Sequence, residues 1–202
     1  METLTNIKLT VCTKLLLLVL LVLIINACNN MQTFDIGDGG LLSKGALCVA
    51  PCFMDITPGL TSRVDVIRIL KANNYWSECV NDITIICYKN LGISFRKNTV
   101  DGVGFRPTTK ITLEQVVEKY GEPDKFVVYN NENPEWIQLS LLFERIQTIL
   151  DLRPQDGNIF VAEPSNKITN IAYSDIGSIE IFIVQGRARK WNGYRTYTDS
   201  NP

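Results

Sequence analysis

The chain has 202 residues, of which 46% are hydrophobic and 20% charged, the balance of an ordinary globular protein with one or two small domains. Its formal net charge of −1 gives no overall attraction to nucleic acid, so a nucleic-acid partner is not expected. Histidine is absent, which removes the usual general base and the commonest metal ligand together and excludes much familiar enzymology.

The N-terminal segment has the pattern of an export signal. Lys8 and Lys14 are followed by an uninterrupted apolar run from Leu15 to Ile25, the order of the charged and hydrophobic regions of a signal peptide. The run has about 11 residues, about half of the roughly 20 that a helix needs to cross a bilayer. We therefore expect residues 1–27 to be a signal peptide, and a retained membrane anchor is the alternative.

The apolar run leads into Ile25-Asn26-Ala27-Cys28, which resembles the bacterial lipobox. At that motif the cysteine is diacylated and becomes the new N-terminus. The resemblance implies that Cys28 is a lipid attachment site and that the exported protein is held on the extracytoplasmic side of a membrane, because two or three acyl chains suffice for stable anchoring. Residues 28–47 are polar and contain several glycines, so we expect a flexible tether there.

Four cysteines follow: Cys48, Cys52, Cys79 and Cys87. An even number in an exported chain favours disulfides, and four cysteines allow three pairings that sequence alone does not distinguish. We favour the local pairing, Cys48 with Cys52 and Cys79 with Cys87. A four-cysteine zinc site is the alternative, but it fits these spacings poorly. A thioredoxin-like site has two residues between its thiols, where Cys48 and Cys52 have three. No cofactor is expected.

The first unit, residues 48–109, is predicted to be a short helix followed by an antiparallel sheet. The helix runs from about Ser62 to Ala72, with Ser62 as its N-cap and Asp65 as the capping partner. The hydrophobic spacing then changes to the period of strands. The strand-like runs are Ile83–Tyr88, Gly92–Lys97 and Val100–Arg106, the last continuing around an Asp101-Gly102 turn pair.

The second unit, residues 110–202, repeats this order about 50 residues later. Thr112 is the N-cap, Gln115 is its partner, and Gly121, in a left-handed conformation, ends the helix before Pro123. The apolar, strand-like runs are Phe126–Tyr129, Trp136–Phe143, Ile146–Leu152, Ile159–Val161, Ile168–Tyr173 and Ile179–Val184. The sequence therefore predicts an α+β fold of two tandem units, each a short helix packed on an antiparallel β-sheet.

Candidate catalytic residues are weak. Four acidic residues are scattered through the second unit: Glu144, Asp151, Asp156 and Glu163. The alternative function is therefore an exported hydrolase that uses a carboxylate or a serine. No pair stands out as poised for acid–base work, and no Gly-x-Ser-x-Gly motif is present. We therefore expect a protein that is not an enzyme.

Large aromatic residues are the candidates for contact with a partner. They bury much area at little entropic cost and are enriched at interface hot spots. The candidates are Trp76, Trp136, Trp191 and Tyr194, and the hypothesis requires that at least one tryptophan be well exposed. For the cationic and aromatic tail, residues 187–197, we favour the interpretation that Trp191 and Tyr194 dock it on the second sheet while its charges face water, and a contact surface for a partner is the alternative.

Two stretches carry a resemblance to a known module: Pro58-Gly59-Leu60-Thr61-Ser62 at the first helix, and Thr112 to Pro123 at the second. They resemble the small α+β module shared by the β-lactamase-inhibitor proteins and by the small lipoprotein of the outer-membrane barrel-assembly machine. In those families a Gly-hydrophobic-Thr turn starts a helix that ends in Gly-x-Pro before an antiparallel sheet. Residues 48–59 also resemble the opening of uncharacterised bacterial lipoproteins built from this module.

The resemblance implies a binding or scaffolding protein without cofactors. Its partners would be the membrane, through the N-terminal lipid, and a protein whose identity the sequence does not give. The matched positions are structural, so the resemblance assigns no contact residue.

Overall fold

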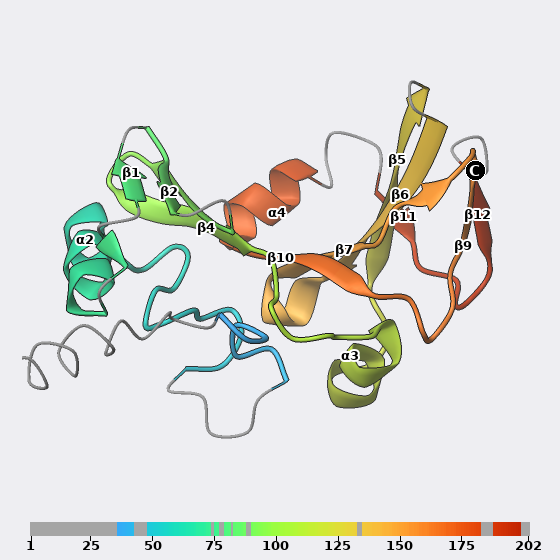
Figure 1. The fold of residues 1–202 in the computed structure, drawn as a ribbon, viewed down its shortest axis with the longest axis horizontal. Coiled ribbons are helices and arrows are strands. Elements are labelled where there is room, and N and C mark those ends of the chain that lie inside the picture. Colours follow the sequence, from blue (N-terminus) through green and yellow to red (C-terminus); the bar gives the residue numbers. More distant parts are fainter. Residues whose placement is uncertain are drawn as a thin grey trace, which may run out of the picture. The chain divides into compact units, whose positions relative to one another are not determined.

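The computed structural model describes residues 36–42, 48–73, 75–76, 79–81, 83–87, 90–132, 135–182 and 188–198. Within this part, ten strands form one antiparallel sheet in the order β1-β2-β3-β4-β10-β7-β6-β5-β11, with β8 beside β6, and β9 pairs with β12 in a second, two-stranded sheet (Figure 1). The fold is therefore mixed and rich in sheet.

The strands are β1 (Cys79–Asn81), β2 (Ile85–Cys87), β3 (Leu91–Arg96), β4 (Thr99–Phe105), β5 (Lys125–Glu132), β6 (Glu135–Phe143), β7 (Thr148–Leu152), β8 (Gln155–Asp156), β9 (Ile159–Val161), β10 (Ile168–Ser174), β11 (Arg189–Lys190) and β12 (Thr196–Thr198). The helices of the described part are α2 (Arg63–Ala72), α3 (Leu113–Tyr120) and α4 (Ile176–Phe182), with a short 3-10 helix, η2 (Glu144–Ile146), before β7.

The two predicted helices begin at their predicted caps. The Asp65 N–H donates to Ser62 Oγ at 3.2 Å, and the Ser62 hydroxyl donates to the Asp65 carboxylate at 2.7 Å. At α3 the Thr112 N–H donates to Gln115 Oε1 at 2.9 Å. These bonds satisfy N–H groups that the first turn of a helix leaves without partners, which is why both helices start where the sequence places the cap.

Gly121 ends α3, with its N–H donating to the Val117 carbonyl at 2.8 Å. Its φ is positive at 85°, as the sequence predicts, but its ψ is −174°. The predicted positive φ is therefore confirmed, and the ψ value places Gly121 outside the left-handed helical region. Gly121 is extended with positive φ, a region that is essentially restricted to glycine, because the chain turns away directly into the segment before β5.

The main core lies on one face of the sheet, and part of the opposite face, which includes Val127 and Leu142, is buried as well. Burial alternates along the strands, for example buried-exposed-buried in β2. Helices α2 and α3 contribute buried side chains to the same core, which includes Val66, Leu70, Leu113, Val116, Ile93, Val103, Leu139, Leu141, Leu150 and Ile171. Figure 1 shows α3 and α4 on opposite sides of the band formed by β10 and β7. Ile179 of α4 is also buried, but outside that core.

Residues 36–42 do not belong to a tether, contrary to the expectation for residues 28–47. Ile36 and Leu41 are buried, and the Leu41 carbonyl accepts hydrogen bonds from Lys119 Nζ at 2.7 Å and from the Tyr120 hydroxyl at 2.5 Å. The Asp38 carboxylate accepts the N–H groups of residues 40 and 42. Two apolar side chains in a polar stretch thus anchor this turn to the folded domain. The rest of the expected tether lies outside the described residues.

The strand predicted at Ile179–Val184 is wrong, because residues 179–182 belong to helix α4. Residues 183 and 184 lie outside the described part. The Ser178 N–H donates to Asp175 Oδ1 at 2.7 Å, and the Ser178 hydroxyl donates to Asp101 Oδ1 at 2.6 Å. These bonds hold the first turn of α4 against β4. A short apolar run is compatible with a strand or a buried helix, and here the polar contacts decide for the helix.

The turn expected at Asp101-Gly102 is also wrong. β4 runs straight through it, with Gly102 paired to Ser94 of β3 and to Ser174 of β10. The chain turns earlier, at Lys97, whose φ is 59°. Pairing on both sides of β4 overrides the turn preference of Asp-Gly.

Candidate functional site

The four cysteines form two disulfides in the local pairing that we favoured. Cys79 and Cys87 are direct cross-strand neighbours in β1 and β2, with Cα atoms 4.0 Å apart. Cys87 is fully buried in the core. This disulfide therefore fixes the register of the β1–β2 hairpin at the end of the sheet.

Three exposed aliphatic residues lie on this hairpin, and we call Val80, Ile83 and Ile86 the hairpin surface. Their exposed fractions are 68%, 81% and 53%. Val80 and Ile86 are opposite each other in the β1–β2 register, so their side chains are neighbours on one face of the sheet, and Ile83 lies in the connecting turn. Large contiguous apolar patches on soluble proteins mark interaction sites, which makes this pair of neighbouring side chains a candidate contact surface.

The start of α2 adds two more exposed aliphatic residues near this hairpin. Leu60 and Val64 are 80% and 69% exposed. Arg63, the residue before Val64, donates from Nη1 to the Ile83 carbonyl at 3.4 Å, which ties the start of α2 to the hairpin turn. Other exposed apolar residues, among them Ile159, Val161 and Ile176, lie on other elements.

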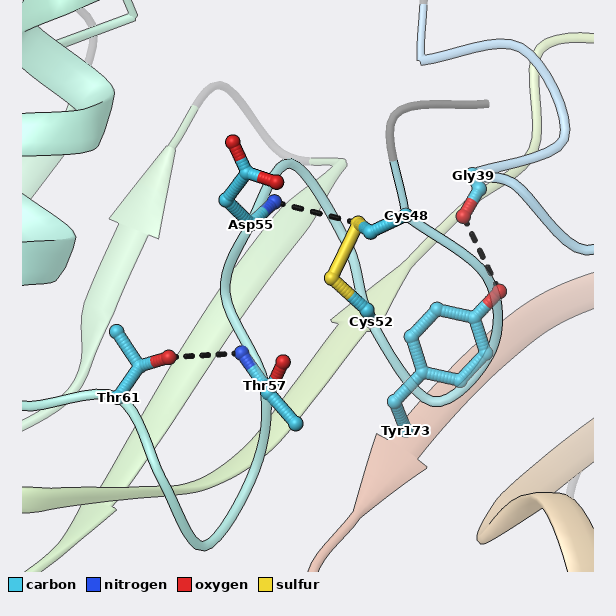
Figure 2. Close-up of a disulfide and its surroundings, with 7 residues drawn as sticks. All are labelled: Gly39, Cys48, Cys52, Asp55, Thr57, Thr61 and Tyr173. Atoms are coloured by element: carbon cyan, nitrogen blue, oxygen red, sulfur yellow. Dashed lines mark hydrogen bonds between the residues drawn. A yellow bond between two sulfur atoms is a disulfide. The ribbon is translucent and has the colours of Figure 1, made fainter. Parts of the chain in front are cut away.

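The second disulfide lies in a different setting. Cys48 and Cys52 are half-buried, with Cα atoms 5.5 Å apart, and the Asp55 N–H donates to Cys48 Sγ at 3.2 Å (Figure 2). The two sulfurs and an Asp55 carboxylate oxygen all lie within 4.8 Å of one another. Sulfur and carboxylate groups this close are a possible ligand set for a metal ion.

A tight turn holds Asp55 in this place. Met54 and Asp55 have φ values of 52° and 64°, and Phe53 and Ile56 on either side exchange two backbone hydrogen bonds of 3.0 and 2.8 Å. Phe53 and Ile56 are both buried in the core. The turn is therefore anchored at both ends.

The structure contradicts the prediction of Trp191 as a candidate for contact with a partner. It is 5% exposed and packs on Tyr197, with ring centroids 5.4 Å apart, and against Phe126, at 6.4 Å. Trp191 thus docks the tail on the sheet at β5, as the favoured interpretation of the tail predicts, and it offers no exposed anchor. Tyr194 is 42% exposed and meets the Trp191 ring edge-on, with centroids 6.2 Å apart.

Neither of the other two tryptophans is well exposed. Trp76 packs partly buried against the core, with Lys71 Nζ 5.5 Å from its ring centroid. Trp136 is half-buried, opposite Asp156 of β8. The requirement for a well-exposed tryptophan is therefore not met, because Trp191 is buried and Trp76 and Trp136 are half-buried. The exposed apolar groups are aliphatic instead.

The acidic residues have separate surroundings. Asp151 accepts from the Ser140 hydroxyl at 2.5 Å and from Asn170 Nδ2 at 3.1 Å, across three adjacent strands. Ser140 is only 1% exposed, which leaves its hydroxyl little access to a substrate. Glu144 pairs with Lys125 at 2.6 Å, and Asp156 lies on β8.

The last of the four, Glu163, lies in a surface turn. Its N–H donates to Asn166 Oδ1 at 2.7 Å. These settings are those of ordinary surface and sheet carboxylates rather than of two carboxylates converging on one point.

Sequence reasoning missed the hairpin surface, although a signal for it was present. Cys79-Val80 and Ile86-Cys87 mirror each other in the sequence, so the favoured pairing of Cys79 with Cys87 in an antiparallel hairpin places Val80 opposite Ile86. Strand β1 has only three residues, too few for a recognisable alternation of apolar and polar residues.

The signal peptide, the lipobox and Cys28 lie outside the described residues. In the part of the chain that is described, no helix combines the length and apolar character required to cross a bilayer. No protein-family model, curated protein or solved structure matches the chain.

Proposed function

We propose that the chain is an exported, lipid-anchored protein that binds a protein partner through the hairpin surface and catalyses no reaction. The observation that carries this proposal is the exposure of Val80, Ile83 and Ile86, between 53% and 81%, on a hairpin closed by a disulfide. A rigid apolar surface loses little conformational entropy when a partner covers it, and burial of its area favours association.

The tandem organisation belongs to the same proposal. Helix α2 is followed by β1, β2, β3 and β4, which are neighbours in the sheet. Helix α3 is followed by β5, β6, β7 and β10, which are also neighbours in the sheet, although β8 and β9 come between β7 and β10 in the chain. The last strands of the two groups, β4 and β10, pair with each other. Two helix-plus-meander units joined through their last strands account for this order, and they leave β1 at one end of the sheet, where a partner can reach it.

Anchoring rests on the sequence Ile25-Asn26-Ala27-Cys28. A membrane-held protein meets partners of the same membrane at a raised effective concentration, so modest contact energy suffices for association. Mass spectrometry of the mature N-terminus tests this step, with acylated Cys28 as the expected result. An intact Met1 terminus, or a cleaved terminus with an unmodified Cys28, would contradict it.

Partner capture from the native membrane tests the binding role. The full chain carries a purification tag, and the variant replaces Val80 and Ile86 by serine. We expect capture of the partner to weaken by at least about 2 kcal/mol, or about 30-fold, which is the scale of an interface hot spot. The melting temperature should be nearly unchanged, because both side chains are exposed.

The matched control replaces Ile159 and Val161 of β9 by serine. These residues are 49% and 40% exposed, so the control removes a similar amount of exposed aliphatic surface elsewhere. Equal capture by the hairpin variant and the unchanged chain would contradict the proposal. Loss of self-association in the hairpin variant, with no other captured protein, would identify the partner as a second copy of the chain.

A further inference from the structure

Three side chains of metal-ligand type meet at the disulfide before α2. In the part of the chain that the structure describes, Cys48, Cys52 and Asp55 are the one group of three cysteine or acidic side chains close enough to hold a metal ion, with ligand atoms within 4.8 Å of one another. We propose that these residues form a metal site that the disulfide closes, and that the reduced site binds Zn²⁺ or a similar divalent ion through two thiolates and one carboxylate.

The distances fit such a site after reduction. Tetrahedral zinc with bonds of about 2.3 Å to sulfur and about 2.0 to 2.2 Å to oxygen holds its ligand atoms roughly 3.4 to 3.8 Å apart. The Asp55 oxygen already lies within 4.8 Å of both sulfurs. The Cα atoms of Cys48 and Cys52 are 5.5 Å apart, so rotation about their side-chain bonds separates the two sulfurs without rebuilding the backbone.

The local backbone supports a thiolate at Cys48. The Asp55 N–H, which donates to Cys48 Sγ at 3.2 Å, would stabilise the negative charge of a metal-bound thiolate in the same geometry (Figure 2). The turn that carries Asp55 is anchored by buried Phe53 and Ile56. Asp55 therefore supplies one ligand and one supporting hydrogen bond from a fixed position.

A divalent cation would neutralise the negative charges of the two thiolates and of the Asp55 carboxylate together. Three protein ligands leave a fourth position for water, which can reach the site because Asp55 is exposed.

The site opens when a small thiol reduces the Cys48–Cys52 disulfide. Two molecules of a small thiol are oxidised to their disulfide, their two electrons cleave the Cys48–Cys52 bond, and two protons go to the cysteine sulfurs. Binding of Zn²⁺ then releases both protons to water. Cys48 and Cys52 are half-buried whereas Cys87 is fully buried, so we expect a thiol to open Cys48–Cys52 before Cys79–Cys87.

Cobalt binding to the full chain tests the proposal, because Co²⁺ reports thiolate ligation by its absorption. The chain is reduced with a small thiol under anaerobic conditions, freed of the thiol and titrated with Co²⁺ and then Zn²⁺. We expect about one tetrahedral cobalt ion per chain with thiolate charge-transfer bands, displaced by zinc. The unreduced chain should show no such bands.

Three variants locate the site. The pair Cys48→Ser and Cys52→Ser should abolish the bands, and Asp55→Asn should weaken binding at least about tenfold, since loss of even an outer-shell partner has that effect. The pair Cys79→Ser and Cys87→Ser is the matched control and should bind as the unchanged chain does. Normal affinity in Asp55→Asn, or bands that survive in the first pair, would overturn the proposal.

A second measurement needs no variant. Zn²⁺ should slow alkylation of Cys48 and Cys52 in the reduced chain, mapped by mass spectrometry, and leave the alkylation of Cys79 and Cys87 unchanged. Equal alkylation of Cys48 and Cys52 with and without Zn²⁺ would also overturn the proposal.

Discussion

The Tyr173 hydroxyl donates a hydrogen bond of 3.1 Å to the Gly39 carbonyl, although the two residues are 134 positions apart in the chain (Figure 2). Tyr173 is fully buried in β10, and its ring meets Phe105 of β4 edge-on, with centroids 5.5 Å apart. This bond joins the first described segment to the centre of the sheet. The segment is thereby part of the folded domain.

Replacing Tyr173 by phenylalanine should lower the free energy of unfolding by about 1 to 3 kcal/mol. The variant keeps the ring but leaves the Gly39 carbonyl without this donor, and an unsatisfied buried acceptor costs that much. Urea unfolding measures the change. The control is Tyr194→Phe, at a side chain that is 42% exposed, where we expect little effect. Equal stability of the two variants would argue against a structural role for the Tyr173 bond.

Replacing Gly39 by alanine should cost about 2 to 5 kcal/mol of unfolding free energy, as the sum of two effects. The φ of Gly39 is +61°, which costs an alanine about 1 to 2 kcal/mol, and the new Cβ would overlap the Phe105 ring, which adds about 1 to 3 kcal/mol of overpacking.

Gly37 provides the matched control for this prediction. Its φ is +58°, but a Cβ there meets no atom within 4 Å, so Gly37→Ala carries the backbone cost alone. Thermal or urea unfolding of both variants separates the two effects. If both variants lose the same stability, the contact between residue 39 and Phe105 is not the cause.

The local parts of the fold could be predicted from the sequence. The caps of α2 and α3 depend on bonds between residues three positions apart, Ser62 with Asp65 and Thr112 with Gln115. The hydrophobic period similarly marks most strands, because alternation reports one buried face. Such signals lie within a few residues of the element that they predict.

The parts of the fold that the sequence predicted wrongly depend on contacts between residues far apart in the chain. Helix α4 is held by the bond between Ser178 and Asp101, 77 positions apart, and the 36–42 segment by the bond between Gly39 and Tyr173. No local pattern records these partners. For the same reason Trp191 remains a contact candidate in the sequence beside the favoured docking of the tail, and only the structure identifies Phe126 and Tyr197 as the side chains that bury it.

Burial raises the pKa of Tyr173 well above its usual value near 10. Above about pH 10 the unfolded chain releases this proton while the folded chain keeps it. Ionisation therefore stabilises the unfolded state, and the free energy of unfolding falls as the pH rises. This contribution to stability should fall by about 1.4 kcal/mol per pH unit above that point. The Tyr173→Phe variant has no such proton. The difference between its free energy of unfolding and that of the unchanged chain should therefore shrink from about pH 10 upward. Urea unfolding of both proteins between about pH 9 and pH 11 measures this difference. A deficit independent of pH would contradict the assignment.

Gly121 provides a test of how the second helix ends. Its φ of +85° and ψ of −174° lie in a region that residues with a Cβ adopt only at a cost of about 1 to 3 kcal/mol. A Cβ at Gly121 meets no atom within 4 Å, so Gly121→Ala should lose this amount through the backbone alone. Gly92→Ala in β3 is the control, since Gly92 has no positive φ and equally open space, and there alanine should be neutral or stabilising by about 0.5 kcal/mol. Urea unfolding compares the two variants. An alanine at 121 as harmless as one at 92 would mean that α3 ends without this glycine conformation.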